Sequence, residues 1–504
     1  MYNRTMRLIL SRFLLSMVIA ALCCGNLHAQ EIPDAGKFLP GPPAETTVEY
    51  IKDYLQYCWG KNMRGTDMGV RAEKDFNAKA PYYLQAFSNA IGVTLSSEDT
   101  PYIAELFDYC MEYGNKSIKQ AKSSFPFFRR PFARFSESSL IPMQENYYIN
   151  ESSYPSRESL MGWMYALLLS EICPDKYNEI LSCGYQFGQA SVITGYHWDS
   201  DVQAARLLAC ALVARLHNHT NVNAMINSAK AEYEKVSGFV YVSPPLTEDT
   251  RQYYSNDDLP DGIQYLPAPP DTVSAIAATD MSKFIEGKNI RPTEEGQIAI
   301  NDVVYDPEYF MEIYSPAFGR TLSAETTPEL LELFVNMYYL GDGGTRSCKN
   351  YYKRPRPYKQ LNESTAYPPA ENLERNTGSY PSGHASAGWL YALLLAELNP
   401  DAVEGLLARA YQYGQGRVIT GYHWQSDVEA GRLVGSAVYA RLHNSEEFLK
   451  QFDRVKRELD GTLGVRSVNT DKTSNAAIYT LSGVKVSEPS RKGVYIQDNK
   501  KVIR

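Results

Sequence analysis

The sequence has few basic residues relative to acidic ones, few long apolar stretches and no metal-binding cysteine pattern. Each of these features argues against a class of protein. Basic residues are outnumbered, with 50 Lys and Arg against 58 Asp and Glu. This balance argues against general nucleic-acid binding, which needs a basic surface to replace counterions. Beyond the N-terminal segment, no apolar stretch is long enough to cross a bilayer. The eight cysteines show no spacing typical of a zinc site.

The N-terminus resembles a secretory signal. A basic start and a short apolar run, residues 13–24, precede a small-residue cleavage site at Ala29. We therefore expect residues 1–29 to be a signal peptide, with a retained anchor as the alternative. The protein would then be exported to the periplasm, or beyond it to the cell surface or the medium, where the environment is oxidising.

Most of the remaining sequence is a tandem repeat. "GKNMRGT" at 60–66 recurs as "GKNIRPT" at 287–293, and "VITGYHWDSDV" at 192–202 recurs as "VITGYHWQSDV" at 418–428. One extra residue separates Lys122 from Arg130 in the first copy. The repeat predicts a first domain at 36–218, a linker at 219–262, a second domain at 263–460, and a linker with a small module at 461–504.

The repeated domains are expected to be all-α bundles. "ASAGWLYALLLAEL" is apolar on every side of a helix, as a buried helix requires. Alternating strand patterns are scarce until the C-terminal tail, whose β-branched runs and glycine turns predict a small β module. That tail resembles the C-terminal sorting modules of type IX-secreted proteins.

The repeat also suggests one disulfide. Cys173 and Cys183 correspond to Asn399 and Arg409 in the second copy, so both cysteines are absent there together. This is expected of a bonded pair in an exported protein. The alternative is a pair of buried free thiols.

Three segments of the second copy carry chemistry. The first, "KNYYKRPRP", begins at Lys349 and clusters positive charge beside prolines in an acidic protein. Arg356 can hold two oxyanions at once and Lys349 adds a point charge, so the cluster suits an anionic ligand. The alternative is an ordinary solvated basic loop.

The second segment, "PSGHASAGWL", predicts a helix start. Ser382 can cap the helix, and Gly383 lets an anion approach the backbone N–H groups there. His384 would lie in the first turn, beside whatever binds. The alternative is a simple cap with an incidental histidine.

The third segment, "GRVITGYHWQSDVEAGR", places Asp427 four residues after His423. If both lay on one helix they would share a face, and the carboxylate would orient the imidazole. Arg417 precedes them. The alternative is a surface His–Asp pair.

In this order, the three segments resemble the signature of the type 2 phosphatidic acid phosphatase and vanadium haloperoxidase superfamily. The wider context, with "LPAPP" at 266–270, is most similar to the bacterial class A nonspecific acid phosphatases. Gly416 departs from the serine that the family usually has before the arginine of the third motif. The resemblance covers most of each copy and implies an α-helical bundle.

The resemblance implies roles for eight residues. The phosphate-binding residues would be Lys349, Arg356, Ser382, Gly383 and Arg417. His423 would attack phosphorus and become a phosphohistidine, oriented by Asp427, while His384 protonates the leaving alcohol and then helps activate water. No metal or other cofactor is implied, because fixed cations and N–H groups stabilise the charge. Since His423 must be neutral and His384 protonated, a bell-shaped pH profile is expected.

The first copy is expected to be inactive. It keeps the counterparts Lys122, Arg130, Pro155, Ser156, His197 and Asp201. Glu158 stands in place of His384, Arg157 in place of Gly383, and Ser191 in place of Arg417. We expect this degenerate copy to pack on the second like the other subunit of a dimer; the rival interpretation is a binding domain for another ligand.

The leading prediction is a metal-independent phosphatase acting on small phosphomonoesters. A vanadate-dependent haloperoxidase is the first alternative, since the same cradle holds vanadate. A lipid-phosphate phosphatase is disfavoured by the lack of spanning segments. A non-catalytic surface binding protein is the last alternative, and the intact motifs of the second copy argue against it.

Overall fold

The computed structural model describes residues 32–242, 253–374 and 376–461, together with four strands in the tail. Up to residue 461 the described regular structure is helical, which confirms the all-α prediction. The expected signal peptide lies outside the described residues. Among the described residues, no helix combines the length and apolar character needed to span a membrane.

The first copy (36–218) is built from long helices joined by short ones. They are α2 (Val48–Met63), α3 (Asp67–Asp75), α4 (Ala80–Ile91), α5 (Pro101–Ser124), α6 (Pro131–Phe135), α7 (Glu145–Tyr148), α8 (Arg157–Ile172), α9 (Tyr177–Thr194) and α10 (Asp199–Leu216). The connector then begins with α11 (Thr220–Ser237) and ends with α12 (Gly262–Tyr265).

The second copy repeats this order with small changes. Its helices are α13 (Ala275–Ile290), α14 (Glu294–Asn301), α15 (Pro307–Phe318), α16 (Pro328–Asn336), α17 (Leu340–Gly343), α18 (Arg346–Tyr352), α19 (Pro357–Leu361), α20 (Glu371–Glu374), α21 (Gly383–Leu398), α22 (Val403–Thr420), α23 (Gln425–Leu442) and α24 (Glu446–Leu459). The single helix α5 of the first copy is thus replaced by the broken series α16, α17 and α18.

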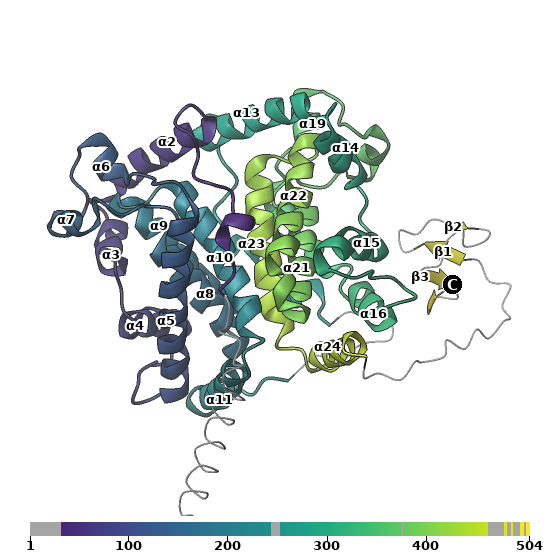
Figure 1. The fold of residues 1–504 in the computed structure, drawn as a ribbon, viewed down its shortest axis with the longest axis horizontal. Coiled ribbons are helices and arrows are strands. Elements are labelled where there is room, and N and C mark those ends of the chain that lie inside the picture. The colour runs from purple at the N-terminus through teal and green to yellow at the C-terminus, as the bar shows by residue number, and fades with distance from the viewer. Residues whose placement is uncertain are drawn as a thin grey trace, which may run out of the picture. The chain divides into compact units, whose positions relative to one another are not determined.

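A buried helix forms the centre of each copy. Helix α21 packs against α22, α23 and α17, and α8 packs against α9, α10 and α5 (Figure 1). Its residues from Ala385 to Glu397 are all buried, as the apolar sequence around the helix predicts. The helix begins after Ser382, whose hydroxyl accepts a hydrogen bond from the Ala385 N–H at 3.3 Å, confirming the predicted cap.

The predicted disulfide is wrong. Cys173 and Cys183 are both free and buried. Cys173 ends α8, whereas Cys183 lies within α9 and faces other partners, the carbonyl of Ala86 and the guanidinium of Arg71. Spacing in a repeat cannot reveal that two side chains point to different neighbours.

Helices of the two copies lie against each other. Helix α2 contacts α13, α10 contacts α21, and α8 contacts α23 (Figure 1). Near the middle of this boundary the Cys210 thiol lies 3.0 Å from the Ser436 hydroxyl. These two residues occupy corresponding positions of the repeat, 226 residues apart.

Two histidines from corresponding positions stack at the same boundary. The rings of His217 and His443 lie 4.2 Å apart, with Glu171 3.1 Å from His217 and Glu397 2.9 Å from His443. Although burial opposes it, the two carboxylates raise the pKa of His217 to about 10. His217 is therefore charged, and removing one of its carboxylate partners would leave a buried charge less well paired.

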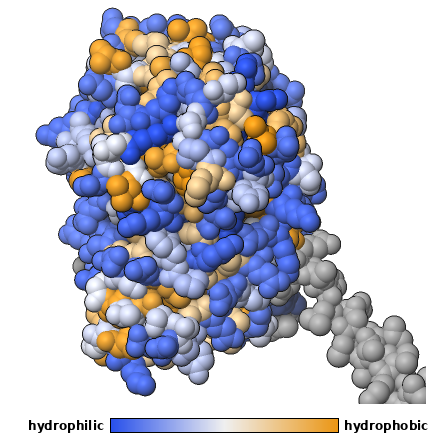
Figure 2. Space-filling model, turned by 90° about the vertical axis from the view of Figure 1, so that its left-hand side faces the viewer, coloured by the Kyte–Doolittle hydropathy of each residue, from blue (hydrophilic) through white to orange (hydrophobic). Residues whose placement is uncertain are grey.

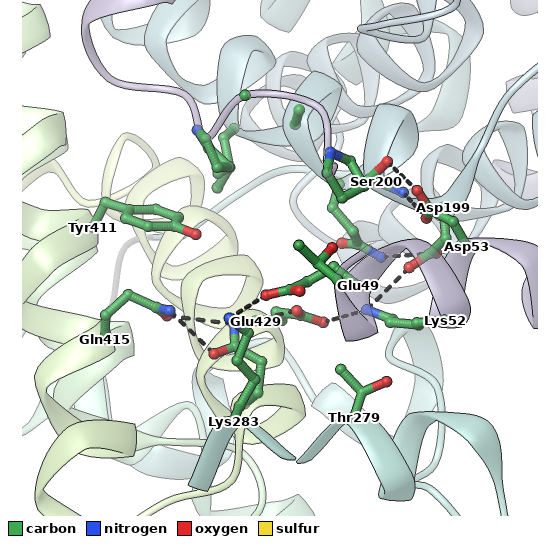
Figure 3. A pocket seen from close by; sticks show the side chains of 18 of the residues that line it. Glu49, Lys52, Asp53, Asp199, Ser200, Thr279, Lys283, Tyr411, Gln415 and Glu429 are labelled. Atoms are coloured by element: carbon green, nitrogen blue, oxygen red, sulfur yellow. Dashed lines mark hydrogen bonds and ion pairs between the residues drawn. The ribbon is translucent and has the colours of Figure 1, made fainter. Parts of the chain in front are cut away.

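A cavity of about 280 Å³ also lies between the copies (Figure 3). Lys52 reaches across it, with Asp199 of its own copy at 3.1 Å and Glu429 of the other at 3.0 Å. A second ion pair, between Glu49 and Lys283, also joins the copies. Although burial opposes it, Glu429 and Asp199 raise the pKa of Lys52, so the ammonium stays charged.

The outer face of the first copy is mostly hydrophilic. Figure 2 shows apolar side chains there in small, separated groups. In the tail, four strands pair antiparallel in the order β2-β1-β3-β4; they are β1 (Ile478–Thr480), β2 (Lys485–Val486), β3 (Val494–Gln497) and β4 (Lys500–Ile503). The interpretation of the tail as a sorting module stays a prediction.

Candidate active site

The predicted residues of the third and first segments meet around His423. Its Nε2 lies 2.9 Å from Nη1 of Arg356, which comes from the loop before α19. Arg417 lies in the last turn of α22, and its guanidinium stacks over the Tyr422 ring at 4.3 Å. His423, Arg356 and Arg417 are all buried. Residues of the first and third segments, 61 positions and more apart in the sequence, therefore lie together in one buried group.

The His423 ring is held by Asp427, but not by the helical spacing that the sequence suggested. His423 precedes the start of α23, and the Asp427 carboxylate turns back to accept the N–H of Trp424 at 2.9 Å. That turn leaves the carboxylate 3.4 Å from His423 Nδ1. The Ser379 hydroxyl donates to the same carboxylate at 2.5 Å and lies 3.4 Å from Nδ1.

These contacts define the protonation of His423. Acceptors face Nδ1, so Nδ1 carries the proton, while the Arg356 N–H points at Nε2, so Nε2 offers its lone pair. Burial and the nearby Arg356 lower the pKa of His423 well below its usual value. The ring is therefore neutral, with its basic nitrogen inside a pocket of cations.

Lys349 and Gly383 lie side by side at the start of α21. The Lys349 ammonium pairs with Asp342 at 2.7 Å. A Cβ atom on Gly383 would lie 2.2 Å from the Asp342 carboxylate and 3.2 Å from the Lys349 nitrogen. Only glycine therefore fits here without displacing the pair. The Ser382 side chain caps the helix and is buried.

His384 lies in the first turn of α21, as predicted, on the edge of this group. Its Nε2 is 3.2 Å from the carbonyl of Val303, and its ring stacks on Tyr413. Since Nε2–H donates to that carbonyl, Nδ1 holds the lone pair. Burial and the charge of Arg417 lower the pKa of His384 to about 3, so the ring is neutral while the pocket contains no phosphate.

Sequence reasoning missed Glu374. Its carboxylate bridges the two arginines, 2.5 Å from Arg356 Nη1 and 3.0 Å from Arg417 Nη2. Although burial opposes it, Arg356 and Arg417 hold the pKa of Glu374 far below its usual value. Its two oxygens stand in for two oxygens of a bound anion. The chain around it, "ENLERNTG", carries no pattern that could have marked this residue.

The two arginines still have capacity for another anion. Arg417 Nε and Nη1 and Arg356 Nε are buried, and within the described part of the chain they have no hydrogen-bond partner. Buried donors are rarely left unsatisfied, so these N–H groups are available to the oxygens of an anion or to water. Arginine N–H groups in this arrangement match the oxygens of phosphate.

Arg354 is a second residue of the site for which the sequence predicted no role. It donates to Asp427 at 2.6 Å and to Asp280 at 2.7 Å. It thereby balances the charge of Asp427 from the side away from His423. Its counterpart in the first copy is Phe128, so this support belongs to the second copy alone.

The first copy places its counterparts similarly but with different chemistry. His197 Nδ1 lies 3.3 Å from Asp201, and Arg130 Nη1 lies 3.2 Å from Nε2. The Glu158 carboxylate, however, lies 3.5 Å from Nε2. The first copy therefore has a carboxylate near each ring nitrogen of this histidine.

Among the described residues, one group could hold a metal ion by its donors alone. Glu171, His217 and His443 present donor atoms within 4.8 Å of one another. Each ring nitrogen of the two histidines already has a hydrogen-bond partner. His217 contacts Glu171 and the Tyr439 hydroxyl, and His443 contacts Glu397 and the Tyr439 carbonyl. Hydrogen-bonded ion pairs therefore account for this cluster, which lies at the boundary of the copies and not in the candidate site.

Comparison with known proteins agrees with the site. The description "PAP2 superfamily" matches residues 331–449, which include every residue of the candidate site. A non-specific acid phosphatase of Providencia stuartii is 38% identical over 213 residues, 42% of this chain and 86% of the relative. The chain belongs to the PAP2 superfamily. Within it, a non-specific acid phosphatase of Salmonella typhimurium (36% identical, covering 42% of this chain and 86% of the relative) and an acid phosphatase of Zymomonas mobilis (30%, 40% and 76%) are also similar.

Glu374 leads to a testable expectation for this PAP2 site. Because its carboxylate occupies the arginines, a phosphate must displace it to reach them. Replacing Glu374 with glutamine keeps the shape of the side chain and removes its negative charge, which competes with phosphate for the arginines. We therefore expect Glu374→Gln to lower the inhibition constant of inorganic phosphate about tenfold. Inhibition constants measured against p-nitrophenyl phosphate would test this. An unchanged or weaker constant would show that Glu374 does not compete for the arginines.

Proposed function

We propose that the second copy is a metal-independent phosphomonoesterase that acts through a phosphohistidine. The observation that carries the proposal is the neutral His423, whose basic Nε2 lies among Arg356 and Arg417 with unsatisfied buried N–H groups beside it. A nucleophile surrounded by fixed cations is what attack on a phosphate dianion requires.

The proposed reaction has two steps. The phosphate displaces Glu374 and its oxygens bind Lys349, Arg356 and Arg417, with Ser382 and the Gly383 N–H at the start of α21. His423 Nε2 then forms a bond to phosphorus while the bond to the alcohol oxygen breaks, and His384 gives its proton to that oxygen. In the second step His384 takes a proton from water, the water oxygen bonds to phosphorus, and the P–N bond breaks.

The proposal predicts activity in EDTA with p-nitrophenyl phosphate as substrate. Activity that disappears in EDTA and returns with a divalent cation would contradict the metal-independent mechanism. Halide oxidation with added vanadate, exceeding phosphate hydrolysis, would favour the haloperoxidase alternative.

The pKa values give the expected sign of the pH dependence. His384 must be protonated to donate, and its pKa of about 3 means that the protonated fraction falls as pH rises. A bound phosphate adds negative charge and raises that pKa, while the low pKa of His423 keeps the nucleophile neutral. We therefore expect kcat/KM for phenyl phosphate to peak in the acidic range and to fall up to about tenfold per pH unit above the optimum.

Measurement of kcat/KM between about pH 4 and about pH 9 tests this expectation. In His384→Gln the fall above the optimum should disappear, because no titrating acid remains. A wild-type profile that is flat over the whole range would contradict the assignment of His384.

We further propose that the protein is exported through a signal peptide at 1–29, and that the copies are two domains, 36–218 and 263–460, packed as a pseudo-dimer. The ion pairs of Lys52 and Lys283 and the His217–His443 stack support the packing. The first domain is proposed to be catalytically inert, and the tail from 461 to be a sorting module.

A further inference from the structure

We propose that the first copy binds an organic phosphate or phosphonate anion with an apolar body and does not hydrolyse it. The proposal is independent of the chemistry assigned to the second copy. It rests on the cavity, the charges and the contacts at the counterpart of the active site.

The first copy has a cavity of about 750 Å³ where its counterpart residues meet. This is within the range of small-molecule sites. Cationic and aromatic side chains share the lining; they are Lys119, Lys122, Arg130, Phe76, Phe125 and Tyr148. The cations suit a charged head group, and the rings suit an apolar body.

The two retained cations are less neutralised than their counterparts. Lys122 and Arg130 share one carboxylate oxygen of Glu151, 3.9 Å from each, and the Glu151 side chain is 55% exposed. Lys349 and Arg356 in the second copy have carboxylates at 2.7 and 2.5 Å. The first copy therefore holds two cations that no carboxylate contacts at hydrogen-bond distance among the described ion pairs.

Two substitutions account for this difference. Asn115 occupies the position of Asp342 and accepts a hydrogen bond from Arg157 Nε at 2.8 Å, so Lys122 has lost its acidic partner. The position of Glu374 is taken by Tyr148, whose ring instead lies 5.2 Å from the Arg130 guanidinium. Burial and Arg130 lower the pKa of Lys122 to about 8, so an anion beside it would be stabilised by both charges.

Glu158 does not cancel these cations. Its carboxylate is buried between His197 at 3.5 Å and Arg157 at 3.6 Å, and it accepts the N–H of Asn77 at 3.2 Å. Although burial opposes it, His197 and Arg157 hold the pKa of Glu158 far below its usual value. The carboxylate thus has His197, Arg157 and the Asn77 N–H as its own partners, and no described ion pair joins it to Lys122 or Arg130.

The same contacts prevent hydrolysis. The Glu158 carboxylate lies 3.5 Å from His197 Nε2, beside the nitrogen that would have to attack phosphorus. Ser191 stands where Arg417 stands in the second copy, and its hydroxyl lies 3.1 Å from that of Ser156. A bound phosphate would therefore lack counterparts of two residues of the second copy, the cation Arg417 and the proton donor His384.

Calorimetric titration of the full chain with phenylphosphonate, which has no hydrolysable ester bond, tests the proposal. We expect two binding sites per chain. Lys349→Met should remove one and Lys122→Met the other, with kcat for p-nitrophenyl phosphate unchanged in Lys122→Met. A single site in the wild-type protein that Lys349→Met removes and Lys122→Met leaves intact would overturn the proposal.

A second variant guards against a folding defect at Lys122. Asn115→Asp is nearly isosteric and restores the acidic partner that Lys349 has. We expect it to weaken phenylphosphonate binding at the first-copy site about tenfold, from one added competing charge. Unchanged affinity would contradict the assignment of Lys122 to the head group. Inorganic phosphate binding as tightly as phenylphosphonate would contradict the apolar subsite.

Discussion

His423→Ala should abolish hydrolysis of p-nitrophenyl phosphate in EDTA, lowering kcat by about 10⁴-fold or more. Its Nε2 is the basic atom that faces the arginines, and within the described site no other neutral nucleophile takes that place. The loss should appear in kcat, because Lys349, Arg356 and Arg417 still bind the phosphate. Rapid quenching with labelled substrate should detect an acid-labile phosphoprotein in the wild type and none in the variant.

The chain contains its own control for this experiment. His197→Ala removes the corresponding histidine of the first copy, which lies between Glu158 and Asp201. We expect kcat to stay within about twofold of wild type, since no catalytic contact is lost. Loss of activity in His197→Ala with His423 intact would contradict the proposal that the first copy is catalytically inert. Full activity in His423→Ala would contradict the assignment of His423 as the nucleophile.

The second large loss of activity is expected when two residues of the second copy are replaced by their counterparts from the first copy. Gly383→Arg with His384→Glu should lower kcat/KM by about 10³-fold or more, because the proton donor is lost and a carboxylate enters the anion pocket. Arginine at 383 also forces a shift, since its Cβ would lie 2.2 Å from the Asp342 carboxylate. The helix should still form, because α8 starts with the same Arg-Glu pair after its own serine cap.

Circular dichroism and thermal unfolding separate this loss from misfolding. The reciprocal change, Arg157→Gly with Glu158→His, is the matched control and should leave the activity of the second copy unchanged. If the double variant of the second copy folds and retains more than about a tenth of the wild-type kcat/KM, His384 is not the proton donor.

Much of the site could be predicted from local pattern. The cap by Ser382 and the position of His384 in the first turn follow from short-range rules, and both are confirmed. The i, i+4 spacing correctly predicted that His423 and Asp427 lie close together. The predicted geometry, with both residues on one helix, was wrong. His423 lies before the helix, and the pair meets because Asp427 turns back to the N–H of Trp424.

Contacts between distant segments could not be predicted. Glu374 lies 43 residues from Arg417 in the chain, and nothing near it in sequence marks it as their partner. Cys173 and Cys183 were expected to pair, but the packing of α9 turns Cys183 toward Arg71 and Ala86. Such errors arise because residue spacing describes distance along the chain and not the direction of a side chain after packing.

The sequence alone was enough to predict a repeated helical unit, in which one copy carries the full set of residue types expected of the PAP2 motifs. Periodicity, caps and the order of motifs are local properties, so they can be read along the chain. The tertiary structure was needed to show what surrounds each histidine: His423 lies beside arginines that Glu374 bridges, and His197 has Glu158 near its Nε2. Protonation depends on burial and on charges from other segments, and packing alone brings those together.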